Sequence, residues 1–154
     1  MWRSDSVTKC VNFFYENGTF SHVRWSTDTV NHSSQLMCYK GSYTYNTNDK
    51  QITVTELSRL YVTPTYYEFG ELIDDVISTM INGSKDEVLA LLDLNHPIYS
   101  GKQVSGKSWT TLSQSELPFQ DLFEPATVEF QDDNHIHLLK FLRDTADYER
   151  VNEQ

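Results

Sequence analysis

The chain has 154 residues, of which 38% are hydrophobic and 13% aromatic, and its formal net charge at pH 7 is -10. This length fits one domain with its own core, and the aromatic content excludes a disordered chain. The excess of acidic residues repels phosphate groups, so nucleic acid is not expected as a partner. No apolar run approaches the ~20 residues that cross a bilayer, so no transmembrane segment is expected either.

The first predicted element is a β-hairpin over residues 8–25. Its turn is placed at Asn17 and Gly18, because this dipeptide tolerates the positive φ angles of a two-residue type I′ turn. With that loop, Tyr15 is expected to face Phe20 across the two strands. Aromatic side chains then occur on both faces of the hairpin, which indicates that both faces are covered.

Alternation of polar and apolar residues predicts a second hairpin, with strands over residues 36–45 and 51–57. Tyr43 and Tyr45 are expected to point to the same side of the sheet, because strand side chains repeat every second residue. Gly41 could mark a bulge, so the face taken by the residues before it is left open.

Helical spacing replaces alternation in the middle of the chain. After a candidate strand over residues 61–67, apolar residues recur at helical intervals over residues 72–81, and this run ends at Asn82 and Gly83. We therefore expect a helical insertion around residues 68–94.

Ser84 and Glu87 form a capping-box pattern, in which each side chain accepts a hydrogen bond from the backbone N–H of the other residue. This pattern predicts a second short helix over residues 85–94. A strand over residues 88–94 is the alternative, because a short apolar run fits both structures.

Strand patterns return in the last third of the chain. A hairpin is predicted around residues 103–112, and another joins residues 127–131 to residues 135–142. Residues 147–151 are expected to form a last short strand. Consecutive hairpins make neighbouring strands adjacent, so the predicted fold is mostly β: an antiparallel meander that forms an up-and-down barrel or a strongly bent sheet.

Four segments near the start of the chain follow a sequence pattern that is typical of one protein family. Residues 2–5 read Trp-Arg-Ser-Asp, residues 13–20 read Phe-Phe-Tyr-Glu-Asn-Gly-Thr-Phe, residues 41–46 read Gly-Ser-Tyr-Thr-Tyr-Asn and residues 51–55 read Gln-Ile-Thr-Val-Thr. Together they resemble the opening strand and first two hairpins of small bacterial lipocalin-like (calycin) domains, over about the first third of the chain.

The resemblance implies one lipocalin-like β domain over residues 1–154, with a helical insertion over residues 68–95. It also implies an exported protein, in the periplasm or at the cell surface, with a lipid-bearing cysteine upstream of Met1 as a tether. If Met1 is the native start, the expected location is the cytoplasm.

Six aromatic residues are candidates for an apolar pocket, because a small barrel encloses a hydrophobic ligand among such side chains. They are Phe13, Tyr15, Phe20, Tyr43, Tyr45 and Trp109. The alternative interpretation is a barrel that is filled by its own large side chains.

Two smaller sets of residues could carry chemistry. His135 and His137 share one strand face at a spacing that some metal sites use, but two ligands do not complete a site. Cys10 and Cys38 could be joined in a disulfide across neighbouring strands or could stay free as buried thiols. The chain has no nucleophile-elbow or phosphate-loop motif, so we expect neither an enzyme nor a cofactor.

The favoured interpretation is a non-enzymatic lipocalin-like domain that binds a small apolar ligand or a protein partner. The alternative is a cytosolic acidic inhibitor or immunity protein, whose negative charge would speed its association with a basic toxin. A metal-dependent enzyme that uses His135 and His137 is the third interpretation.

Overall fold

The computed structural model describes residues 1–4, 9–28, 33–64, 69–93, 95, 104–105 and 109–151. Eight of its strands form a closed barrel in which consecutive wall strands pair with each other, always antiparallel, and the first pairs with the last. The wall strands are β1 (Trp2–Ser4), β2 (Lys9–Phe14), β3 (Thr19–Asp28), β4 (Ser33–Asn46), β5 (Gln51–Pro64), β8 (Ala126–Asp132), β9 (His135–Phe141) and β10 (Asp144–Arg150). The predicted mostly-β meander is confirmed, and it closes into a barrel.

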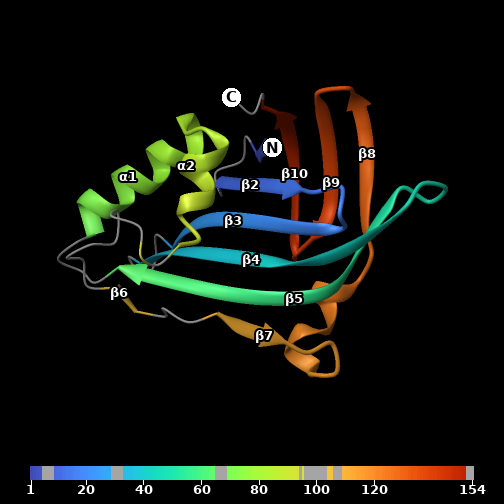
Figure 1. Ribbon diagram of the computed structural model, residues 1–154, viewed down its shortest axis with the longest axis horizontal. Coiled ribbons are helices and arrows are strands. Elements are labelled where there is room, and N and C mark those ends of the chain that lie inside the picture. Colours follow the sequence, from blue (N-terminus) through green and yellow to red (C-terminus); the bar gives the residue numbers. More distant parts are fainter. Residues whose placement is uncertain are drawn as a thin grey trace.

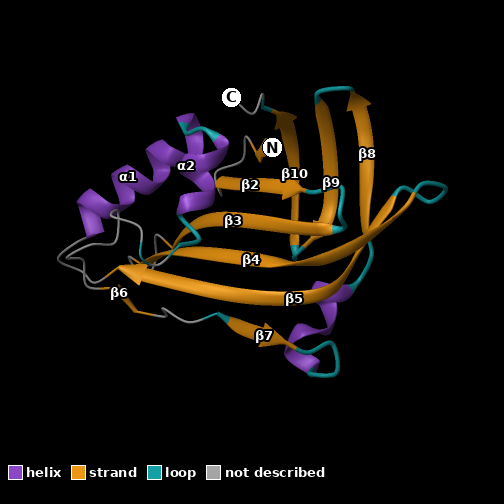
Figure 2. Cartoon of the chain, viewed as in Figure 1, coloured by secondary structure: helices purple, strands orange, loops and turns teal. Residues whose placement is uncertain are grey.

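Figures 1 and 2 show how the wall is arranged. Strands β2 to β5 run across the view, whereas β8, β9 and β10 run in a crossing direction. Strands that twist and tilt in this way let a small sheet close on itself. The long hairpin of β4 and β5 projects beyond the rest of the barrel.

The predicted helical insertion is confirmed as α1 (Phe69–Asn82) and α2 (Lys85–Ala90). The side chain of Ser84 accepts a hydrogen bond from the backbone of Glu87, at 3.3 Å, and the Glu87 side chain accepts one from the backbone of Ser84, at 3.2 Å. This capping box makes the segment a helix and not the alternative strand. Among the described residues, no helix is long and apolar enough to cross a membrane.

Both faces of the wall at β2 to β5 are covered, as the aromatic pattern predicted. One set of buried side chains fills the barrel interior, and Phe20, Leu57, Leu138 and Phe141 belong to it. The other face carries Val11, Phe13, Val23, Cys38 and Leu60, against which the two helices pack. The helical residues in this second core are Val76, Met80, Val88 and Leu91.

The first hairpin is confirmed, but its predicted register is wrong by one residue. The loop has three residues, 16–18, with Gly18 at a φ of +84°, and Phe14 pairs with Phe20. The N–H of Gly18 donates to the carbonyl of Tyr15 at 3.1 Å, as in a type I turn that ends in a glycine bulge. A shift of one residue turns Phe13 and Tyr15 outward and Phe14 inward.

In the second hairpin Tyr43 lies opposite Val54 and Tyr45 opposite Ile52, so the two tyrosines share one face of the sheet as predicted. A bulge does occur beside Gly41, but its extra residue is Thr55 on the partner strand. Beyond the bulge, β5 continues unbroken to Pro64, so the separate strand predicted over residues 61–67 is, in its described part, the end of β5.

The hairpin predicted around residues 103–112 is wrong in its described part. β6 (Val104–Ser105) and β7 (Thr110–Leu112) do not pair with each other but both pair with β5, whose end extends past β8. Since β5 pairs with β8 only near Gln51 and Ile52, β7 occupies the free edge that remains. The sequence pattern shows the strand propensity but not the strand partner.

The 3-10 helix η3 (Leu117–Phe123) and the β9–β10 turn close the end of the barrel away from the long β4–β5 hairpin. Leu142 in this turn is buried, although its φ is +51°, and its carbonyl accepts a hydrogen bond from Arg24 at 3.0 Å. Arg143 forms an ion pair with Asp121 of η3 at 2.7 Å, which lowers the pKa of that carboxyl. These contacts leave the opposite end as the mouth of the barrel.

Candidate functional site

An apolar cavity of about 180 Å³ lies at the mouth of the barrel. Its walls come from β1, β2, β4, β5, β8 and β9, so the complete ring of strands is needed to form it. The lining residues are Trp2, Phe14, Tyr43, Tyr45, Ile52, Val128, Phe130 and Ile136. A cavity of this volume has room for a molecule of about one ring, since an apolar cavity of about 150 Å³ accommodates benzene.

Aromatic rings form the inner end of the cavity. The ring of Phe14 lies 5.4 Å from the rings of both Tyr43 and Phe141, centre to centre, and Phe20 lies 5.5 Å from Phe141. Most of these pairs are tilted or edge-on, which is the arrangement that aromatic pairs prefer. The hydroxyl of Tyr43 donates to the carbonyl of Tyr15 at 2.9 Å and so fixes that side chain at the cavity wall.

The rim of the cavity is exposed and carries one positive charge. Tyr45 and Phe130 expose 40% and 56% of their surface at this rim. The guanidinium of Arg150 lies 4.8 Å from the centre of the Trp2 ring. This stacking holds Trp2 at the entrance.

A layer of polar side chains lies directly below the cavity. Asn12 pairs with the cavity residue Trp2 across β1 and β2, and Asn12 also shares the inner face of β2 with Phe14. Asn12 is hydrogen-bonded to Nδ1 of His22, which is its partner on β3. Both side chains are buried, at 1% and 0% exposed.

This polar layer contains orphaned hydrogen-bonding atoms. Nδ2 of Asn12, Nε2 of His22 and Nε of Arg24 are buried and have no hydrogen-bond partner in the part of the chain that the structure describes. A buried polar atom without a partner costs about 1–3 kcal/mol, so such atoms are rare in folded proteins. All three lie on the adjacent strands β2 and β3 and belong to one layer of the barrel interior.

Burial also sets the protonation of the layer. It keeps the pKa of His22 well below its ordinary value, and the nearby charge of Arg24 lowers this pKa further, so the imidazole is neutral at pH 7. Burial raises the pKa of Cys10 to about 12, and its thiol donates to Asp144 at 3.4 Å. The pKa of Tyr148 is raised for the same main reason.

Three of the six predicted pocket residues face the barrel interior. Tyr43 and Tyr45 line the cavity, and Phe20 lies below it in ring contact with Phe14. Phe13, Tyr15 and Trp109 instead belong to the helix-covered core on the other side of the wall. The six lining residues that were not predicted are Trp2, Phe14, Ile52, Val128, Phe130 and Ile136. Alternation groups such residues onto one face of each strand, but only the closed barrel decides that this face points inward.

The disulfide that the sequence allowed between Cys10 and Cys38 is not formed, and both thiols are free and buried. Cys10 belongs to the interior core, whereas Cys38 belongs to the core under the helices. β3 separates their strands, and two strand spacings, about 10 Å, exceed the Cα distance that a disulfide spans.

His135 and His137 lie on the outer face of β9, each beside a carboxylate. Nδ1 of His135 is 2.9 Å from Asp132, and Nδ1 of His137 is 2.7 Å from Asp147. The hydrogen bond with Asp132 raises the pKa of His135. Within the described ranges, no three His, Cys, Asp or Glu side chains are grouped so that they could hold a metal ion.

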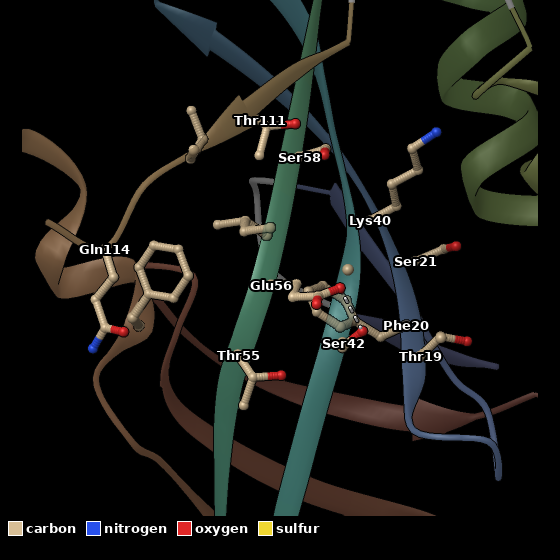
Figure 3. A pocket seen from close by; sticks show the side chains of 14 residues that line it. Thr19, Phe20, Ser21, Lys40, Ser42, Thr55, Glu56, Ser58, Thr111 and Gln114 are labelled. Atoms are coloured by element: carbon tan, nitrogen blue, oxygen red, sulfur yellow. Dashed lines mark hydrogen bonds between the residues drawn. The ribbon is translucent and has the colours of Figure 1, made fainter. Parts of the chain in front are cut away.

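A second hollow, of about 680 Å³, lies on the outer surface of β3, β4, β5 and β7 (Figure 3). Hydroxyl groups of Ser21, Ser58 and Thr111 point from the strands in this region, and Ser42 donates to Glu56 at 3.4 Å. This hollow is larger than the mouth cavity, but hydroxyl and charged side chains make up much of its lining, whereas the mouth cavity is lined almost entirely by apolar and aromatic side chains. The mouth cavity is therefore the candidate site.

The fold and the cavity define the class to which the chain can be compared: an eight-stranded up-and-down β-barrel, consistent with a calycin-like fold. No family model, curated protein or solved structure matches the chain.

Proposed function

We propose that the protein is a non-enzymatic binding domain that takes a small, mainly apolar molecule into the mouth of its barrel. The observation that carries this proposal is the cavity of about 180 Å³, which has apolar walls and a rim of exposed Tyr45 and Phe130. Ligand sites are concave and mostly apolar, and barrel mouths are among their usual places. The exported location that the family resemblance implies stays a prediction.

A cavity-filling substitution tests this proposal. Val128→Phe places a ring in the cavity, whereas Ser58→Phe places the same ring in the outer hollow and serves as the matched control. Toluene is a suitable probe, and for a ligand of this size we expect a dissociation constant of roughly 1 mM or lower. Calorimetry should show that Val128→Phe abolishes binding and that Ser58→Phe leaves it unchanged.

Tryptophan fluorescence gives a second readout of the same site. Trp2 lines the cavity, whereas Trp109 packs against the helix-covered core. The fluorescence change on toluene binding should therefore vanish in Trp2→Phe and persist in Trp109→Phe. A wild-type protein that binds no probe, or an equal loss of signal in both variants, would contradict the proposal.

A further inference from the structure

We propose that Asn12 and His22 receive the polar end of the ligand, and that this end is an uncharged hydroxyl group. This inference rests on the proposed binding function and names the chemical class of its ligand: a ring-sized apolar molecule with one hydroxyl. It follows from the position of the two residues below the cavity and from the atoms that each leaves without a partner.

The Asn12–His22 pair lies next to the cavity on two sides. Trp2 and Phe14 both line the cavity. Asn12 is the cross-strand partner of Trp2, and it is the next inward-facing residue to Phe14 along β2. On the other side, the cavity residue Ile136 is the cross-strand partner of Tyr148. The polar layer is therefore the next layer of side chains inward from the cavity.

The hydrogen-bonding requirement of the pair does not depend on how its protons are placed. If Asn12 accepts from Nδ1 of His22 through its oxygen, the orphaned atoms are the acceptor Nε2 and the donor Nδ2. If the Asn12 amide is turned over, the orphaned atoms become the donor Nε2–H and the acceptor Oδ1. In each arrangement one buried donor and one buried acceptor lack a partner with hydrogen-bond geometry. The Tyr148 hydroxyl interacts with the Asn12 side chain, and a ligand hydroxyl would take its place there.

A hydroxyl group satisfies both atoms, because it donates once and accepts through two lone pairs. An ionised carboxylate cannot, because it only accepts. An ammonium cannot either, because it only donates, and it would also meet the positive charge of Arg24, which already acts on His22. The Asn12–His22 pair therefore matches an uncharged hydroxyl; Arg24 would attract a carboxylate, but a carboxylate leaves the acceptor of the pair without a donor.

Access to the pair passes the ring of Phe14. This side chain is half-buried at the cavity, and its ring stands between the cavity and Phe141, whose ring lies 6.1 Å from that of His22. The proposal requires that Phe14 rotate about its side-chain bonds, so that the cavity extends to the polar layer.

Phenol and toluene form a matched pair of probes, because they differ only by a hydroxyl in place of a methyl group. We expect wild-type protein to bind phenol about tenfold more tightly than toluene, as measured by calorimetry near pH 7, where phenol is uncharged. In the double variant Asn12→Leu/His22→Phe, this ratio should fall to about one. Thr44→Val/Thr53→Val, which removes two hydroxyls from the outer side of the β4–β5 hairpin, should keep the tenfold preference.

The double variant removes both partners of the buried pair, so it should unfold at a temperature equal to or above that of wild type. A second measurement needs no variant: the 15N chemical shift of His22 Nε2 should change when phenol binds and stay constant when toluene binds. A purely structural role for the pair would not produce this difference.

The outcomes separate the two proposals. If both probes bind equally to wild type, if the preference for phenol persists in the double variant, or if the His22 shift responds alike to both, the role of Asn12 and His22 is overturned while the binding function stands. If neither probe binds wild-type protein, the binding function fails, and this inference fails with it.

Discussion

At the scale of single residues, the environment of each cysteine decides its chemistry. Cys10 lies among interior side chains and Cys38 under the helices, and burial raises the pKa of both thiols to about 12. The reactive form of cysteine is the thiolate, so neither thiol is expected to react while the protein is folded. From the sequence, a disulfide and two free thiols were equally consistent with the pattern, because the face taken by Cys38 depends on a bulge that only the structure locates.

We therefore predict that folded protein at about pH 8 does not react with a thiol reagent such as iodoacetamide, and that both cysteines react in guanidinium without any reductant. Mass spectrometry of the labelled protein measures this directly. Loss of both reactive thiols under non-reducing conditions would reveal a disulfide and contradict the structure. Rapid labelling of the folded protein would show instead that the thiols are accessible.

At the scale of elements, the first hairpin shows how one loop residue changes a site. Residues 16–18 are compatible with both a two-residue and a three-residue loop, because Gly18 accepts a positive φ in either. The N–H of Tyr43 donates to the carbonyl of Gly18 at 2.8 Å, and Phe14 finds ring partners inside the barrel. These contacts with later parts of the chain select the three-residue loop. The local sequence alone therefore does not predict that Phe14 faces the cavity.

Gly41 is the residue that allows β5 to bend at its bulge. A Cβ atom at this position would overlap the backbone oxygen of Glu56. We predict that Gly41→Ala lowers the free energy of unfolding by about 3 kcal/mol, because backbone atoms cannot move aside as a side chain can. The exposed neighbour Thr44→Ala should change it by roughly 0.5 kcal/mol. Urea unfolding measures both, and equal stabilities would show that the two strands lie further apart at this point.

At the scale of the whole molecule, long-range packing closes the barrel at positions that carry no local signal. Leu142 and Arg143 adopt positive φ angles although neither residue favours them. Leu142 is nevertheless held inside the core, and Arg143 is tied to Asp121 and to the carbonyl of Pro118. The turn exists because these tertiary contacts offset its local cost.

The burial of His22 makes the stability of the whole molecule depend on pH. Its pKa is lowered in the folded state, so the unfolded chain takes up a proton below about pH 6.5 while the folded protein does not. Stability is therefore unaffected by this group above pH 6.5 and falls as the pH drops, by up to about 1.4 kcal/mol per pH unit. At about pH 5, this group should account for a loss of at most about 2 kcal/mol relative to pH 8.

Denaturant unfolding between pH 5 and 8 checks this prediction. His22→Gln should flatten the curve in this range, because glutamine does not titrate. His135→Gln is the control. His135 is exposed and the hydrogen bond with Asp132 raises its pKa, so protonation of His135 slightly increases the stability of the folded protein as the pH falls. Parallel curves for wild type and His22→Gln would mean that folded His22 is protonated as easily as the unfolded residue.

The acidic-inhibitor interpretation also belongs to this scale, because it depends on the net charge of -10. A charge of this sign and size speeds encounter with any basic protein but does not define a contact surface. It stays a prediction, and native mass spectrometry of protein from its own host would test it. A basic protein bound in fixed stoichiometry would favour it over a small ligand.

The sequence by itself determined the elements whose signals are local. Alternation of polar and apolar residues identified the β4–β5 and β8–β9 hairpins. Helical periodicity identified α1, and the capping box identified α2. The mostly-β meander with a helical insertion therefore followed from interactions between residues close in sequence. Tertiary structure alone decided which face of each strand points inward, which strand β7 pairs with, and where the chain closes. These features depend on burial against distant residues, and the cavity together with the Asn12–His22 layer beneath it exists only after the ring of strands has closed.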